Sequence, residues 1–127
     1  MEQKIKRAYE MAKNNGFWDT ERNVPEMLML VVSEVAEALE ALRKDQRADP
    51  FIAELSYNDL EHLNDESKEL WKKSFEDSIK STFEDEIADA IIRLLDMCTP
   101  LGIDIDFHVR EKLKYNDTRS YKHGKKF

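Results

Sequence analysis

The sequence has few of the residues that make tight turns or covalent cross-links. Its 127 residues include three glycines, three prolines and a single cysteine. So little Gly and Pro leaves little material for many tight turns, which predicts a mostly helical fold. One cysteine excludes an internal disulfide framework and fits a reducing cytosol. We expect Cys98 to fill the core rather than act as a nucleophile, because neither His nor Cys adjoins it.

Long apolar segments are also missing. No apolar run is long enough to span a bilayer. The first residues, MEQKIKRAYEMAKNNG, form an amphipathic helix pattern without the apolar stretch of a signal peptide. These observations predict a cytoplasmic protein with no membrane partner. The length suits one domain, residues 1–127, with one core.

Acidic residues are in excess, with 27 Asp and Glu against 20 Lys and Arg and a net charge of −7. The chain as a whole would be repelled by nucleic-acid phosphates, so we expect no nucleic-acid partner. Residues 108–127 reverse the balance, with seven basic residues against two acids, and the remainder carries −12. An acidic body with a basic end is either a solvated surface with a loose tail or a metal site facing a phosphate-binding end.

Helical spacing and stop signals predict an all-α fold of four to five helices. The second predicted helix has Pro25 in its first turn. A capping box from Ser81 to Glu84 is expected within the fourth. Residues 51–77 have weaker helical spacing and predict one or two short helices. The other expected ranges are about 2–14, ended by NNG; 23–44; 78–98, ended by TPLG; and a last helix from Asp104 or Asp106 to 117.

Two of these helices carry the same short pattern. EVAEAL at 34–39 matches EIADAI at 86–91, so each helix offers an acidic pair three residues apart on one face. Glu34 lies inside an apolar stripe of its helix, formed by Met27, Leu30, Val31, Ala38 and Ala41. A second stripe of the same helix holds Leu28, Val32, Val35, Leu39 and Leu42. The core side expected for the later helix holds Phe83, Ile87, Ala90, Leu94 and Met97.

If the two helices face each other in antiparallel fashion, four carboxylates converge. Such a cluster needs protonation, Lys or Arg partners, or a metal, and its hard oxygen ligands suit Mg²⁺ or Mn²⁺. The alternative is that these are ordinary solvated charges, with Arg93 pairing with Asp89 one turn away. The sequence lacks the repeated Glu-x-x-His of a di-iron bundle and the clustered Cys and His of a zinc site.

The two acidic patterns and the basic end lie in the segments SEVAEALEALR, EDEIADAIIRLLD and KLKYNDTRSYKHGKKF. Together these segments resemble the MazG-like, all-α nucleoside triphosphate pyrophosphohydrolase family. The resemblance implies an antiparallel four-helix-type bundle. It also implies Mg²⁺-dependent hydrolysis of the α–β phosphoanhydride bond of an NTP or dNTP to NMP and pyrophosphate, serving nucleotide-pool cleansing. Apolar character on two helix faces predicts a homodimer or a dimer of dimers.

The resemblance also implies a role for each matching residue. Ser33 stands where the family has a first glutamate. Glu37, or else Glu34, is the expected general base. The metal ligands would be Glu34, Glu37, Glu86 and Asp89; the phosphate and sugar contacts would be Lys112, Asn116 and Arg119; and the aromatic side chains that hold the base would be Phe17 and Trp18.

Other interpretations stay open on the sequence. Lys112, Asn116 and Arg119 also fit a solvated basic helix end. Phe17 and Trp18 also fit a loop packed onto the core. For the whole chain, the alternatives are a phosphoribosyl-ATP pyrophosphohydrolase and a non-catalytic helical interaction module with a residual metal site.

Overall fold

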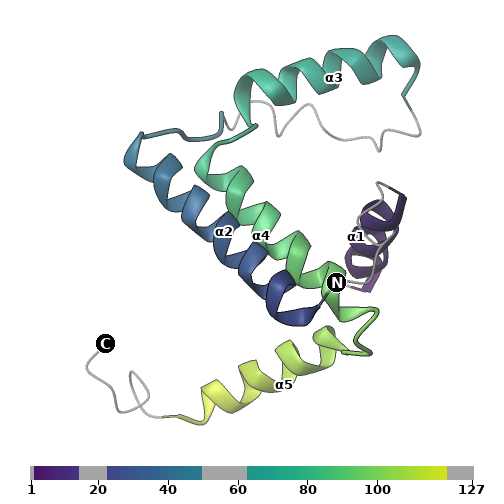
Figure 1. The fold of residues 1–127 in the computed structure, drawn as a ribbon, viewed down its shortest axis with the longest axis vertical. Helices are drawn as coiled ribbons and strands as arrows, with labels where there is room; N and C mark the ends of the chain where they lie inside the picture. The colour runs from purple at the N-terminus through teal and green to yellow at the C-terminus, as the bar shows by residue number, and fades with distance from the viewer. Residues whose placement is uncertain (1, 15–22, 50–62, 120–127) are drawn as a thin grey trace. The chain divides into compact units, whose positions relative to one another are not determined.

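A computed structural model describes residues 2–14, 23–49 and 63–119; Phe17, Trp18 and the tail after 119 lie outside these ranges. The described residues form five α-helices and no strand, which confirms the all-α prediction (Figure 1). None of these helices is long and apolar enough to cross a membrane. The helices are α1 (Glu2–Asn14), α2 (Val24–Arg43), α3 (Asp65–Ser78), α4 (Phe83–Cys98) and α5 (Ile105–Asp117).

The chain divides into two compact units. One unit spans Val24–Ile91 and holds α2, α3 and the first part of α4. The other combines Met1–Asn23 with Ile92–Phe127 and holds α1, the end of α4 and α5. The two acidic pairs belong to the first unit and the predicted phosphate contacts to the second.

Helix α2 ends in a Schellman motif. Asp45 adopts a left-handed conformation with φ of 53°. Its N–H donates to the Leu42 carbonyl at 3.1 Å, and the Gln46 N–H donates to the Ala41 carbonyl at 2.9 Å. These two bonds satisfy carbonyls that the helix end leaves open. The helix therefore ends at Arg43, one residue before the predicted end.

Helix α4 begins later than predicted, at Phe83 rather than 78, and its cap is shifted by one residue. Thr82 is the N-cap, because its Oγ1 accepts from the Asp85 N–H at 3.3 Å. The Asp85 carboxylate in turn accepts from the Ser81 N–H at 2.8 Å. The predicted Ser81–Glu84 capping box is thus wrong: residues up to Ser78 belong to α3, and Glu84 has a different partner.

Glu84 ties the segment after α2 to the start of α4. Its carboxylate accepts from Arg47 Nε at 2.7 Å and from the Ala48 N–H at 2.8 Å. These bonds, the one from Ala48 first, lower the pKa of Glu84 to about 2. The Phe83 N–H also donates to the Gln46 carbonyl at 2.8 Å. The end of α2 therefore meets the beginning of α4, and the two helices run antiparallel (Figure 1).

One stripe of α2 faces α4, as predicted. Met27, Ala38 and Ala41 on that stripe are buried, as is Ala90 on α4. Small side chains at a helix contact allow the two backbones to approach closely, which brings the acidic pairs together.

The other apolar stripe of α2 is uncovered in the single chain. Its five members, Leu28, Val32, Val35, Leu39 and Leu42, are 45–54% exposed. The predicted core side of α4 is wrong in part: Ala90 and Met97 are buried, but Ile87 and Leu94 are exposed. An apolar surface therefore remains on this helix pair.

Helices α3 and α5 largely agree with the ranges that the sequence predicted. Residues 51–77 were expected to hold one or two short helices, and their described part forms α3, where Trp71 stacks on Phe75 with ring centroids 5.4 Å apart. In the second unit, Asp104 caps α5 by accepting from the Phe107 N–H at 3.1 Å. Cys98 is buried at the end of α4, and burial raises the pKa of its thiol. The burial of Cys98 agrees with the predicted place of this residue in the core.

Candidate metal centre

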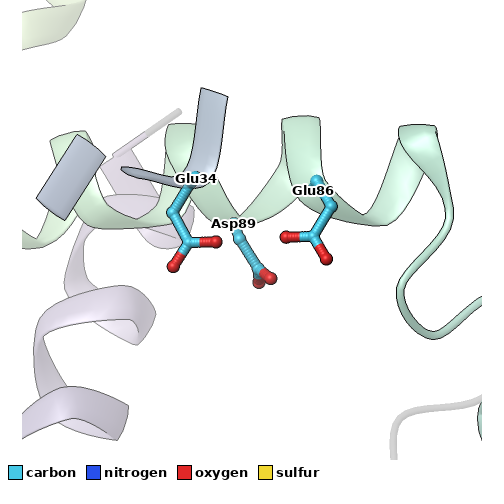
Figure 2. A group of neighbouring side chains, drawn as sticks. All are labelled: Glu34, Glu86 and Asp89. Carbon is cyan, nitrogen blue, oxygen red and sulfur yellow. The ribbon is translucent and has the colours of Figure 1, made fainter. Parts of the chain in front are cut away.

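Three carboxylates of the two acidic pairs converge between α2 and α4. Glu34, Glu86 and Asp89 each offer one carboxylate oxygen, and the three atoms all lie within 4.8 Å of one another. Figure 2 shows Glu34 on α2, and Glu86 and Asp89 on α4, projecting into the same space. The facing of the two helices that the sequence predicted is therefore confirmed for these residues.

This cluster is shielded from water. Glu34 is 9% exposed and Glu86 8%, and Asp89 is half-buried. Carboxylates are almost never buried to this extent unless they are paired or bind a metal. For Glu34 and Glu86, the alternative of an ordinary solvated helix face is therefore wrong.

Glu37 completes the group from the exposed side. Its side chain is exposed, and its hydrogen bond with Glu86, like that of Glu34, contributes to the raised pKa of Glu86. Glu37 therefore contacts the buried cluster while it remains open to solvent.

The pKa of Glu86 reflects the carboxylates that surround it. Burial first of all, then hydrogen bonds with Glu37 and Glu34 and the negative charges of Glu37 and Asp89, together raise the pKa of Glu86 to about 7. Its Oε2 atom is buried, and no N–H or O–H group in the described ranges donates to it. A buried oxygen without a donor costs free energy. The carboxylate needs either a proton or a cation.

The donor set fits a hard divalent cation. Glu34, Glu86 and Asp89 could hold a metal ion, and all the ligand atoms they offer are carboxylate oxygens. Such ligands suit Mg²⁺ or Mn²⁺ better than softer ions. Glu86 Oε2, which accepts no hydrogen bond from the described residues, is an acceptor that a cation would satisfy. The residues present therefore fit the ion that the sequence pattern implied.

The predicted phosphate contacts lie on α5 and just after it, in the second unit. Lys112 and Asn116 are one turn apart, and Arg119 follows the C-cap Thr118. Lys112 Nζ lies 4.9 Å from the centroid of the Tyr115 ring, and Arg119 Cζ lies 5.6 Å from it. The structure thus brings Lys112 and Arg119 to one aromatic ring. Tyr115 was missed from the sequence, although its position three residues after Lys112 and four before Arg119 was a usable signal.

Comparison of the chain with known protein families, with curated proteins and with solved structures found no match. The assignment of a function therefore depends on the geometry of the carboxylate cluster and on the motifs.

Proposed function

We propose that the protein is a Mg²⁺-dependent nucleoside triphosphate pyrophosphohydrolase of the MazG-like kind, which converts an NTP or dNTP to NMP and pyrophosphate. The observation that carries the proposal is the convergence of buried Glu34 and Glu86 with Asp89, including a Glu86 oxygen to which no group of the described residues donates. A fold gains little from burying like charges unless a ligand compensates them. The motif resemblance supplies the reaction.

In this proposal the carboxylates bind the metal ion and accept a proton. Bound Mg²⁺ would neutralise phosphate oxygens and lower the pKa of a coordinated water. Glu34, Glu86 and Asp89 hold the ion, and Glu37, which contacts Glu86 from the solvent side, also binds it or accepts the proton of the attacking water. We assign Glu37 rather than Glu34 as general base because Glu37 is exposed and Glu34 is buried.

The substrate contacts come from α5 with the residues directly after it, and from the aromatic segment before α2. Lys112, Asn116 and Arg119 hold phosphate oxygens and sugar hydroxyls through charge-assisted hydrogen bonds. Phe17 and Trp18 stack on the base.

Hydrolysis of a nucleotide panel tests the proposal. Common NTPs and dNTPs, with oxidised and methylated forms, are incubated with the protein and Mg²⁺, and the products are resolved as NMP with pyrophosphate or NDP with phosphate. We expect NMP and pyrophosphate from the wild type, and a rate at least about a hundredfold lower from Glu37→Gln. No turnover of any nucleotide, with Mg²⁺ or Mn²⁺, would refute the general hydrolase and leave phosphoribosyl-ATP hydrolysis or a non-catalytic module.

The proposal includes a second copy of the chain. The exposed stripe Leu28, Val32, Val35, Leu39 and Leu42 follows the alternating four- and three-residue spacing of a coiled-coil seam. On α4, Ile87 and Ile91 are likewise exposed. Contiguous apolar faces of this kind mark protein interfaces. Pairing of α2 and α4 with the same two helices of a second copy would complete the four-helix bundle that the sequence predicted. The result would be a homodimer or a dimer of dimers.

Leu39→Glu should therefore dissociate the oligomer. The substitution places a charge within the stripe, where Leu39 is 48% exposed in the single chain. Light scattering after size exclusion measures the mass, and we expect the mass of an oligomer for the wild type and of a 15.0 kDa monomer for the variant. Leu70→Glu is the matched control, because Leu70 is 62% exposed on α3, outside the stripe. A monomeric wild type would contradict this part of the proposal.

A further inference from the structure

Tyr115 lies between two cations on the exposed side of α5. Lys112 precedes it by three residues and Arg119 follows it by four, so all three share one side of the helix and its continuation. The Lys112 ammonium is 4.9 Å and the Arg119 guanidinium 5.6 Å from the ring centroid. Both distances fall within the roughly 6 Å over which an aromatic ring attracts a cation.

These two cations differ from their neighbours on the same helix. Arg110 pairs with Asp106 at 3.6 Å and with Glu111 at 3.9 Å, and Lys114 pairs with Glu111 at 3.0 Å. No carboxylate within the described part of the chain neutralises Lys112 or Arg119. Their positive charges therefore remain available to an anionic ligand.

The backbone after α5 keeps Arg119 near the ring. The Tyr115 carbonyl accepts from Thr118 Oγ1 at 2.6 Å and from the Thr118 N–H at 3.0 Å. The Arg119 N–H donates to the Asn116 carbonyl at 3.2 Å. This hydrogen-bonded turn continues past the helix end, so Arg119 stays on the side of Tyr115 instead of following an extended chain.

We propose that Tyr115 is a positioning residue that orients Lys112 and Arg119 as a pair for the oxygens of one polyphosphate chain. An aromatic face attracts a cation without cancelling its charge, whereas a carboxylate partner would compete with the phosphates. The ring therefore restricts the long side chains before the ligand arrives, which lowers the entropy lost on binding. The inference deepens the proposed function and rests on it for the identity of the substrate.

The test compares Tyr115→Leu with Tyr115→Phe. Phe keeps the aromatic face and Leu removes it, and the side chain is 55% exposed, so neither change disturbs a core. Calorimetry measures the affinity for inorganic tripolyphosphate in the presence of Mg²⁺, and steady-state kinetics give KM and kcat for the best nucleotide. We expect Leu to weaken tripolyphosphate binding about fivefold and Phe to retain it, with the nucleotide defect in KM rather than in kcat.

A double-mutant cycle separates positioning from a structural role. In a Lys112→Ala/Arg119→Ala background, Tyr115→Leu should have no further effect on binding, because the ring acts through those two residues. Lys114→Ala is the matched control, since Lys114 is paired with Glu111, and it should bind as the wild type does. Equal losses for Leu and Phe, or a Leu effect that persists in the double-alanine background, would overturn the assignment.

The outcome also distinguishes this inference from the proposed function. A wild type that does not bind tripolyphosphate would refute the role of Tyr115 directly. Binding that depends on Tyr115, with no hydrolysis of any nucleotide, would refute the proposed hydrolase function and support the positioning role of Tyr115.

Discussion

Mg²⁺ should stabilise the protein strongly at about pH 8 and little at about pH 5.5. Glu86 has a pKa of about 7 in the fold, well above its ordinary value of 4.5, with burial as the first cause. At the lower pH a proton compensates the carboxylate, and the ion must displace it. At the higher pH the Glu86 charge is uncompensated until a cation binds.

The sign of the metal-free pH dependence follows from the same shift. Because the folded pKa is raised, the contribution of Glu86 to stability is fully present below pH 4.5 and is lost as the pH rises through about 7. Without divalent cations, the free energy of unfolding should therefore fall between about pH 5 and about pH 8. Mg²⁺ at about a hundredfold above its Kd should restore about 2–3 kcal/mol, a rise in Tm of several degrees.

Thermal melts at the two pH values, with Mg²⁺ or with a chelator, measure the effect. A matched NaCl series controls for ionic strength, because screening alone also relieves repulsion in an acidic protein. An equal Mg²⁺-induced rise at both pH values, or an equal rise with NaCl, would contradict specific binding at the cluster.

The carboxylate cluster could be predicted because its signal was local. The repeated pattern of EVAEAL and EIADAI gave both acidic pairs, and the apolar neighbours of Glu34 indicated which way it pointed. The Glu34–Glu86 contact then followed from antiparallel pairing of the two helices. Helical periodicity is sufficient for this step because residues three apart must share a face.

The errors arose where local patterns compete. Ser81–Glu84 and Thr82–Asp85 both fit a capping box, and tertiary contacts select between them. The segment after α2 offers Arg47 and the Ala48 N–H to Glu84, which leaves Asp85 for the cap. That segment is 36 residues from Glu84 in the sequence, so no local pattern contains this information.

The helical pattern of the sequence also could not predict which apolar residues of α4 are buried. Ile87 and Leu94 have the spacing of core residues but are exposed in the single chain. Periodicity identifies an apolar face of a helix, but it does not indicate whether the same chain or another molecule covers that face. Tyr115 was missed for a related reason. Its spacing from Lys112 and Arg119 was a signal, but cations at this spacing from an aromatic residue are common on helices, and the distances in the structure distinguish this case.

Two identical substitutions, two residues apart on α4, should have opposite effects on stability. Glu86→Gln removes an uncompensated buried charge, and its amide N–H groups can donate to the carboxylates of Glu34 and Glu37, which contact this position. At about pH 8 without divalent cations, we expect the variant to be more stable than the wild type by about 2 kcal/mol. It should lose most of the Mg²⁺-induced rise in Tm, and any nucleotide hydrolysis should fall at least about a hundredfold, because an ion ligand is gone.

Glu84→Gln is the matched control. The pKa of Glu84 is lowered to about 2, first by the Ala48 N–H and then by Arg47. The charge of Glu84 therefore stabilises the fold above pH 4.5, and this contribution is lost as the pH falls toward 2. Near neutral pH, the Gln variant should melt a few degrees below the wild type and keep the Mg²⁺ response and the activity. If both variants instead lowered the Tm, Glu86 would be a stabilising charge in the metal-free fold, and the cluster would not need a cation.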